Sequence, residues 1–309
     1  MHDSGMGEHN SIDHGPDGDT GLSPDMLEVV KFVPPPALAP FVTQIYFFRC
    51  DQEHVRDFQP AAPGHLIFLL KGSGMLKFQD GHVDAVTKAS VIGPGLASVE
   101  LHIDGPLHDL GFALSPLGFV ALTGRAANDY VDRAVPASTL FGLEIDILTE
   151  RFITGHADGT MRLAEMVDEV AKFLLSRLNA VPPSHVHLVQ TVIGWLSSDF
   201  DPDVEQLYAQ LDMSRSTTVR LITKYFGSAP KQLMRKYRAL RAATIMVDPR
   251  APEQMRAQVE SIFYDQPHMI REIRQFAGRT PGALDSNDAK LMRLWLNRDN
   301  FRDIDSFLA

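Results

Sequence analysis

A cluster of basic side chains in the last third of the chain has the chemistry to bind nucleic-acid phosphates. Residues 213–247 contain eight lysines and arginines and no acidic residue, although the whole chain has a formal net charge of −10. The eight are Arg215, Arg220, Lys224, Lys231, Arg235, Lys236, Arg238 and Arg241. Both residue types neutralise phosphates, and arginine also binds guanine with two hydrogen bonds. The cluster predicts an electrostatic footprint for nucleic acid, with a solvated basic helix face as the alternative.

Two helices with a tight turn between them are predicted to present the first of these arginines. Asp201-Pro202 predicts a helix start, because aspartate caps helices and proline is tolerated in the first turn. Ser214 caps a second helix, which ends at Gly227. The residues predicted to face inward are Val204, Leu207, Tyr208, Leu211, Thr218, Leu221, Ile222 and Tyr225. A short helix, a turn of about three residues and a longer helix with outward arginines form the helix-turn-helix layout.

The same layout is predicted a second time, after a long helix over residues 230–247. The inward stripe of the long helix is Leu233, Tyr237, Leu240 and Thr244, and Lys231, Arg235 and Arg238 form another stripe. In the second pair of helices the inward residues are Met255, Val259, Ile262, Met269, Ile273 and Phe276. Asp265 caps the last helix and Gly278 ends it. Two copies joined by one basic helix are a more specific signal than either copy alone.

Several strings of the sequence resemble the AraC/XylS family of transcription regulators. MSRSTTVRL (213–221), YFGSAP (225–230) and RALRAA (238–243) are similar to the first half of that family's DNA-binding domain. FYDQPHMIREIR (263–274) and GRTP (278–281) are similar to its second half. LAPFV (38–42), LGFALSPLG (110–118) and DRAVP (132–136) resemble, more weakly, the sensor region of one AraC branch. The resemblance implies an effector-sensing barrel of cupin type, a helical connector often used for dimerisation, and a C-terminal DNA-binding module.

On this basis the candidate DNA-binding residues lie on the outward faces of the two recognition helices and beside them. They are Arg215, Ser216, Thr217, Val219, Arg220, Thr223, Lys224, Lys231, Arg235, Gln266, Pro267, His268, Arg271 and Arg274. Arg220 and Arg271 are the leading candidates for guanine contacts, and Gln266 for adenine. Lys224, Lys231 and Arg235 suit phosphates, which position a protein without reading sequence. For each residue the alternative is an ordinary solvated helix face.

Four positions depart from the family pattern. Tyr208 and Gln258 stand where the family has a small residue, usually alanine, at a close helix crossing. Asp212 and Ile262 stand where it has a glycine in each turn. A left-handed isoleucine would cost roughly 1–2 kcal/mol or force another geometry. We expect compensated repacking, and the alternative is a second unit that binds DNA poorly.

The first half of the chain is predicted to be a small β-barrel. Strands are predicted at residues 42–48, 66–70, 75–78 and 110–114, with hairpin turns at Gly72-Ser73-Gly74 and Asp80-Gly81. A helix is predicted over about residues 160–178, ending before Pro182-Pro183. The expected fold is therefore α+β: a cupin-like N-terminal β-barrel, a helical connector and an all-α double helix-turn-helix. The expected limits are 1–30 (disordered acidic tail), 31–142 (sensor barrel), 143–183 (connector), 184–284 (DNA-binding domain) and 285–309 (C-terminal helical extension).

Other chemistry is thinly represented. There is no phosphate loop and no G-x-S-x-G, and His65, His82, His102 and His108 lack a His-x-His pattern with a following Glu, so we expect neither an enzyme nor a metal site or cofactor. Cys50 is the only cysteine, which fits a reducing cytosol. We expect no secretory signal and no membrane partner, because the start lacks a basic and apolar leader and no apolar run approaches ~20 residues.

The predicted function is a cytoplasmic, sequence-specific DNA-binding transcription regulator that responds to a small-molecule effector and forms a homodimer. One alternative is a ligand-binding or enzymatic cupin-like barrel whose helical half has lost DNA binding. Another is an interaction adaptor that uses the apolar C-terminal residues Leu291, Leu294, Trp295, Phe301, Ile304 and Phe307. The strings do not name the effector or operator, and they do not separate an activator from a repressor.

Overall fold

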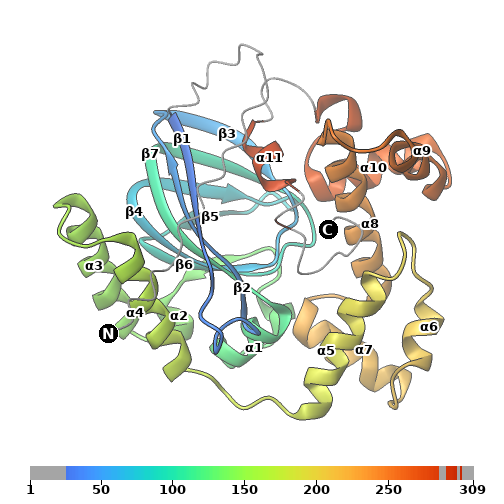
Figure 1. The fold of residues 1–309 in the computed structure, drawn as a ribbon, viewed down its shortest axis with the longest axis horizontal. Helices are drawn as coiled ribbons and strands as arrows, with labels where there is room; N and C mark the ends of the chain where they lie inside the picture. Colours follow the sequence, from blue (N-terminus) through green and yellow to red (C-terminus); the bar gives the residue numbers. More distant parts are fainter. Residues whose placement is uncertain (1–25, 285–289, 298–299, 301–309) are drawn as a thin grey trace, which may run out of the picture.

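The first half of the protein is an eight-stranded antiparallel sheet. We describe it from a computed structural model, in which residues 26–284, 290–297 and 300 are placed (Figure 1). The strands are β1 (Leu27–Phe32), β2 (Val42–Cys50), β3 (His54–Gln59), β4 (Gly64–Lys77), β5 (Val83–Val86), β6 (Ala89–Ile92), β7 (Val99–Leu114) and β8 (Ala134–Pro136). Their order is β1-β2-β7-β4-β6-β8, with β3 paired to β7 and β5 paired to β4.

The predicted barrel is wrong in one respect, because the sheet is not closed. Along the described strands the hydrogen-bonded path ends at β1 on one side and at β8 on the other. β6 and β8 are four and three residues long, so they offer too short a ladder to continue the sheet. The predicted tail 1–30 is also corrected at its end, since residues 27–30 belong to β1 and pair with β2. Residues 1–25 lie outside the described part of the chain.

β4 corrects the predicted hairpin at Gly72-Ser73-Gly74. The strand continues from Gly64 to Lys77, and its register against β7 shifts around Lys71. Gly72 has φ +86°, and a Cβ there would lie 2.4 Å from the Pro106 carbonyl oxygen. The glycine therefore permits a bulge that bends a long strand rather than a turn between two strands. The predicted turn at Asp80-Gly81 is confirmed, with φ +90° at Gly81 between β4 and β5.

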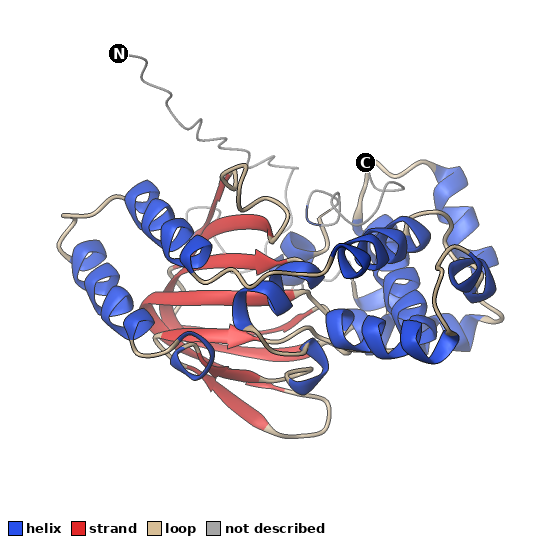
Figure 2. Cartoon of the chain, turned by 90° about the horizontal axis from the view of Figure 1, so that it is seen from below, coloured by secondary structure: helices blue, strands red, loops and turns tan. Residues whose placement is uncertain are grey.

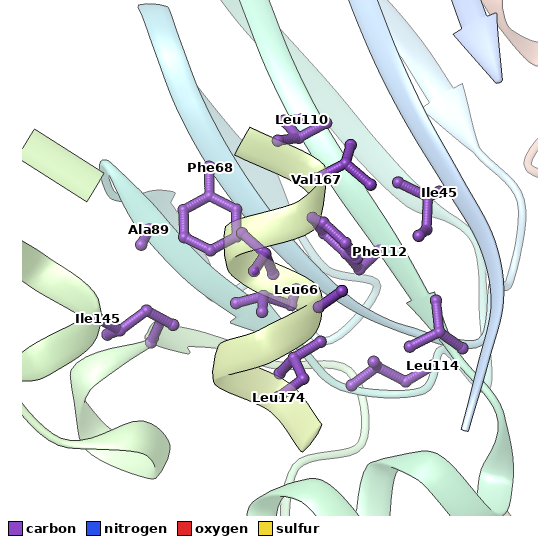
Figure 3. Close-up of a cluster of buried hydrophobic side chains, with 14 of the residues drawn as sticks. Ile45, Leu66, Phe68, Ala89, Leu110, Phe112, Leu114, Ile145, Val167 and Leu174 are labelled. Carbon is purple, nitrogen blue, oxygen red and sulfur yellow. The ribbon is translucent and has the colours of Figure 1, made fainter. Parts of the chain in front are cut away.

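Both faces of the sheet are covered, because its strands alternate apolar side chains toward each side. One face, which we call the α4 face, packs on α4 (Leu163–Ser176), whose predicted helical stripe is confirmed. Figure 3 shows the residues that meet there, including Ile45, Leu66, Phe68, Leu110, Phe112, Val167 and Leu174. The opposite face, which we call the α11 face, carries Phe48, Ile67, Leu69 and Leu107 and packs on Leu291 of α11 (Lys290–Trp295).

The remaining described helices lie around the sheet and in the C-terminal part. They are α1 (Pro116–Thr123), α2 (Ser138–Phe141), α3 (Glu144–Ala157), α5 (Pro183–Leu196), α6 (Val204–Ala209), α7 (Arg215–Phe226), α8 (Pro230–Val247), α9 (Glu253–Ile262) and α10 (Gln266–Ala277). Figure 2 shows a group of helices gathered at one end of the sheet, and Figure 1 labels α5 to α10 in that group. None of the helices described is long and apolar enough to cross a membrane.

The helical part is hydrogen-bonded to loops of the sheet. Helix ends leave carbonyl groups without partners inside the helix. At the end of α10, Gln275 O accepts from Ser98 N at 2.9 Å and Phe276 O accepts from Ala61 N at 2.8 Å. α1 joins the two parts from the other side, since Leu117 and Val120 share a cluster with Trp195 of α5. The limits predicted for the separate domains remain predictions.

Candidate nucleic-acid interface

α6 and α7 form the first of two helix pairs that carry the predicted DNA-binding residues. Ser214 caps α7 as predicted, accepting from Thr217 N at 3.2 Å, and Gly227 ends it with φ 84°. The predicted start of α6 is wrong by two residues, because Asp203 rather than Asp201 is the cap and accepts from Glu205 N at 3.0 Å. The inward face of α7 is confirmed, and its buried residues include Thr218, Leu221, Ile222 and Tyr225.

The outward face of α7 presents the predicted residues to solvent. Arg215, Ser216 and Arg220 are exposed, and Thr217, Val219, Thr223 and Lys224 are partly exposed. Arg215 pairs with Glu205 of α6, and its guanidinium lies 5.0 Å from the ring centre of Tyr208. Arg220 therefore lies on a free helix face, whereas Arg215 is held across the turn by α6.

α9 and α10 form the second pair, and α10 matches its predicted faces. Asp265 caps α10 by accepting from His268 N at 2.6 Å. Met269, Ile273 and Phe276 are buried. Gln266, Pro267, Arg271 and Arg274 are exposed. Tyr264, which is not among the predicted contacts, is 94% exposed in the turn before α10 and extends this surface. An aromatic residue directly before the cap of a helix, in a polar turn, is the sequence signal that could have identified Tyr264 as an exposed contact residue.

The four departures from the family pattern cause no backbone strain. In the part of the chain that the structure describes, Asp132 is the one non-glycine residue with positive φ, so neither Asp212 nor Ile262 is left-handed. Ile262 is the last residue of α9, and the chain turns at Phe263, which has φ −90° and ψ 143°. The predicted cost at Ile262 is therefore avoided by a different turn. Tyr208 is only partly buried and Gln258 is exposed, so neither side chain occupies a closed helix crossing.

The basic cluster is smaller at the surface than the sequence predicts. Lys236, Arg238 and Arg241 of α8 are 3%, 7% and 2% exposed. Arg241 donates to Asp199 O at 2.8 Å and to Leu196 O. A buried charge requires partners of this kind, so these three side chains hold parts of the protein together instead of meeting phosphate.

Lys236 connects α8 to the sheet. Its ammonium donates to Gly95 O at 2.6 Å and to Ala62 O at 3.4 Å. Burial lowers the pKa of this lysine to about 8, and the nearby Asp132 carboxylate opposes that shift. The lysine belongs to the contact between the two parts, and its place in a basic sequence run gave no sign of this role.

Glu272 organises the cations between α8 and α10. Its carboxylate is 1% exposed and accepts from Arg235 Nε at 2.6 Å and from Arg238 Nη2 at 2.8 Å. His268 Nε2 lies 3.4 Å from the same carboxylate, and Arg238 also pairs with Asp201 at 2.7 Å. Arg235 and His268 were predicted DNA contacts, but the structure gives both a partner inside the protein. Sequence reasoning missed Glu272, although its spacing from Met269 and Phe276 places it on the inward stripe of α10.

The remaining candidate phosphate residue on α8 lies at its start. Lys231 is exposed in the first turn of α8, immediately after the loop that follows α7. The side chains available to a nucleic acid are therefore those on the outward faces of α7 and α10, together with Lys231, which lies between the two helices in sequence.

The histidines of the predicted barrel do not form one cluster. His65 Nδ1 lies 2.8 Å from Pro63 O, His102 pairs with Glu100 at 2.8 Å, and His108 lies 2.8 Å from His156. Within the described ranges no group of three potential ligands could hold a metal ion.

Residues 30–136 match a family model described as a domain of unknown function, DUF6597. The DUF6597 region is about a third of the chain and contains most of the sheet. It ends before α7 and α10 begin. A comparison with the curated proteins found no significant match.

Solved structures of similar fold include ToxT from Vibrio cholerae O395, with 9% identity and a TM-score of 0.44 over 81% of this chain and 96% of ToxT. ToxT bound to (E)-4-(8-methylnaphthalen-1-yl)but-3-enoic acid has 9% identity and a TM-score of 0.43 over 82% and 99% of the two chains. CuxR, described as an AraC-like transcriptional activator, has 15% identity and a TM-score of 0.32 over 74% and 84%.

Proposed function

We propose that the protein is a sequence-specific DNA-binding transcription regulator of the AraC type, with two helix-turn-helix units. One observation carries this proposal: α7 and α10 are both capped twelve-residue helices with a buried apolar face and an exposed arginine face, and both pack against α8. Recognition helices enter the major groove, and successive grooves on one side of B-DNA are about 34 Å apart. Arg220 and Arg271 are the proposed base-reading residues, and Ser216, Val219 and Gln266 adjoin them.

Replacing either arginine is expected to weaken specific binding while the fold survives. Arg220→Ala or Arg271→Ala removes an exposed side chain that has no structural partner to lose in the described contacts. The expected loss is about 1–3 kcal/mol for each, or roughly 5- to 150-fold in Kd. The measurement is binding to the protein's own promoter fragment by fluorescence anisotropy, with circular dichroism to check folding.

A matched control is Arg49→Ala, because Arg49 is also an exposed arginine but lies on β2 and pairs with Asp51 at 2.8 Å. Its affinity for the same fragment is expected to equal that of the wild type. Unchanged binding by both Arg220→Ala and Arg271→Ala would contradict the proposed interface.

The second candidate function, a ligand-binding or enzymatic sheet whose helical part has lost DNA binding, is favoured by the burial of Lys236, Arg238 and Arg241. A salt titration separates the two functions. Binding through phosphates weakens steeply as salt rises, because bound counterions are released. Measurable DNA binding at low salt, with an affinity that falls steeply as the salt concentration rises, supports the regulator. The absence of any DNA binding at low salt supports the second candidate.

We further propose a small-molecule effector, which ToxT's bound organic acid illustrates for that protein. The cavity lined by Gly64, Phe119, Tyr225 and Lys236 between the sheet and the helices is about 30 Å³, room for one or two waters, so it admits an effector only after the two parts move. A cytoplasmic location completes the proposal.

We also propose a homodimer formed through α3 and α4. Leu143 and Ile147 are 76% and 70% exposed beside a surface groove that Leu148 and Phe173 also line. Large exposed apolar side chains that cluster on one surface mark interaction sites. Ile147→Asp is expected to shift a dimer to the monomer in analytical ultracentrifugation, whereas Val33→Asp, an equally exposed position away from the groove, is expected to leave the dimer intact. A monomeric wild type would refute this part.

A further inference from the structure

The described C-terminal residues 290–297 and 300 lie between the α11 face of the sheet and the helices of the second half. Figure 1 shows α11 beside β3 and next to α10. Leu291 is buried in the cluster of the α11 face, and Leu294 and Trp295 pack against that cluster. Met292 and Leu296 are fully buried in a different cluster, with Ile273 and Phe276 of α10. α11 is therefore a wedge with one side on the sheet and the other on α10.

A carboxylate fixes one end of this wedge. Asp57 of β3 is 4% exposed and accepts from Met292 N at 3.1 Å. Its other oxygen accepts from Arg279, just after α10, at 2.8 Å. One side chain of the sheet thus holds both the start of α11 and the end of α10, so the two attachments depend on each other.

An asparagine side chain fixes the other end. Asn300 Oδ1 accepts from Lys31 Nζ of β1 and from Gln44 Nε2 of β2, both at 3.2 Å. Its Nδ2 donates to Leu294 O at 2.9 Å and to Trp295 O at 3.1 Å, which satisfies carbonyls at the end of α11. Asn300 therefore joins two strands of the sheet to the end of the helix through one amide group.

The contact is built for reversible attachment. α11 has six residues, and an isolated helix of that length is unstable in water, so it persists only through its contacts. The sheet beneath it is partly polar: the cross-strand register places Lys31, Tyr46 and Gly111 in one row, and Asp109 beside Phe48 and Leu69 in the next. A face with these polar groups gives up less hydrophobic free energy on separation than the fully apolar α4 face does.

Both recognition helices are restrained at their C-terminal ends. A Cβ on Gly227, after α7, would lie 2.6 Å from Val131, and one on Gly278, after α10, would lie 2.5 Å from Phe58. Two helices anchored to one sheet cannot adjust their spacing independently to two grooves of DNA. The contact of α10 with the sheet also includes the wedge and Asp57. Residues 290–297 and Asn300 therefore act on the position of α10 and not on that of α7.

We infer that residues 290–297 together with Asn300 are an autoinhibitory latch, which holds α10 against β3 through Asp57 and Asn300 and lowers DNA affinity while it is closed. This effect on affinity rests on the proposed function, but the existence of the latch does not. Release separates α11 from the sheet and breaks the shared attachment at Asp57. α10 then keeps its backbone bonds to Ala61 and Ser98 but loses the shared carboxylate, so it can shift toward a groove while α8 keeps it joined to α7.

The test opens the latch from either side in the full-length protein. Asn300→Ala removes the amide, and Gln44→Met removes a donor on the sheet without changing the sequence of the C-terminal segment. The rate of hydrogen–deuterium exchange is expected to rise at least tenfold in residues 290–297, 54–59 and 275–279. The rate is expected to stay the same in the parts of β4 and β7 that carry Leu66, Phe68, Leu110 and Phe112 against α4. The double variant is expected to exchange no faster than Asn300→Ala alone, because Asn300→Ala already removes the bond to Gln44. Asn179→Ala, which also loses an amide bonded to carbonyls but lies between α4 and α5, is the matched control.

Affinity for the promoter fragment is measured on the same variants. Both opening variants are expected to bind about tenfold more tightly than the wild type and Asn179→Ala. Unchanged exchange in residues 54–59 and 275–279 would overturn the latch, and faster exchange with equal or weaker DNA binding would overturn its inhibitory role. Absence of DNA binding by every variant, with the exchange pattern as expected, would instead refute the proposed function and leave a structural latch established.

Discussion

Glu272→Ala is expected to destabilise the helical part by about 3–5 kcal/mol, because it removes the shared acceptor of two arginines. Arg238 is 7% exposed and would keep only the Asp201 carboxylate among its described ion pairs, while Arg235 and His268 would lose the same partner. An unpaired buried cation is costly because the protein interior cannot replace water. Urea unfolding followed by circular dichroism measures the loss.

Glu205→Ala is the matched control on the other helix pair. Glu205 also pairs with an arginine, Arg215, but the two side chains are 59% and 66% exposed. Exposed pairs contribute little, so the expected loss is below about 1 kcal/mol. Equal effects of the two substitutions would show that Glu272 does not organise α8 and α10.

Asp109→Asn is expected to abolish a large pH dependence of stability. Burial raises the pKa of the Asp109 carboxyl to about 8, and its Oδ1 has no hydrogen-bond partner among the described residues. In the unfolded chain the pKa is near the ordinary aspartate value of 3.8. Below about pH 4 the carboxyl is protonated in both the folded and the unfolded protein, so it does not lower the free energy of unfolding. Between pH 4 and 8 the unfolded chain releases a proton that the folded protein keeps, so the free energy of unfolding falls as pH rises.

The size of this effect follows from about 1.4 kcal/mol for each pH unit. The wild type is expected to lose about 4 kcal/mol between pH 5 and 8 that Asp109→Asn retains. Urea unfolding at intervals across this range gives the difference. Burial also lowers the pKa of His65 from 6.5 to about 4, so this histidine changes the stability of both proteins between those pH values, and its effect cancels in the difference between the wild type and Asp109→Asn. Asp104→Asn, an exposed position on the same strand, is the control and should parallel the wild type. Parallel curves for Asp109→Asn would contradict the burial of an unpaired carboxyl.

The helices and their faces could be predicted closely because their signals are local. Ser214 and Asp265 cap α7 and α10 as expected, and Gly227 and Gly278 end them. Apolar spacing of three and four residues identified the buried stripes, since it depends only on the 3.6-residue helical period. These elements place Arg220 and Arg271 outward without any knowledge of the tertiary structure.

The sheet was predicted less well because strand pairing is not local. The segments around Ile45, Phe68 and Phe112 were recognised as strands, but nothing in their sequence distinguishes a closed barrel from an open sheet. Gly72 has the composition of a turn, yet β7 pairs with β4 on both sides of it and makes it a bulge.

The sequence by itself determined where α7 and α10 begin and end, which side of each faces solvent, and that basic residues collect around them. The tertiary structure alone decided which of those basic residues are available to bind DNA. Glu272 and the carbonyl groups of Gly95, Asp199 and Leu196 lie far in sequence from the cations they bind, or on another helix. A lysine or arginine has the same charge in either setting, and only the position of its partner decides whether that charge holds the protein together or remains free for DNA.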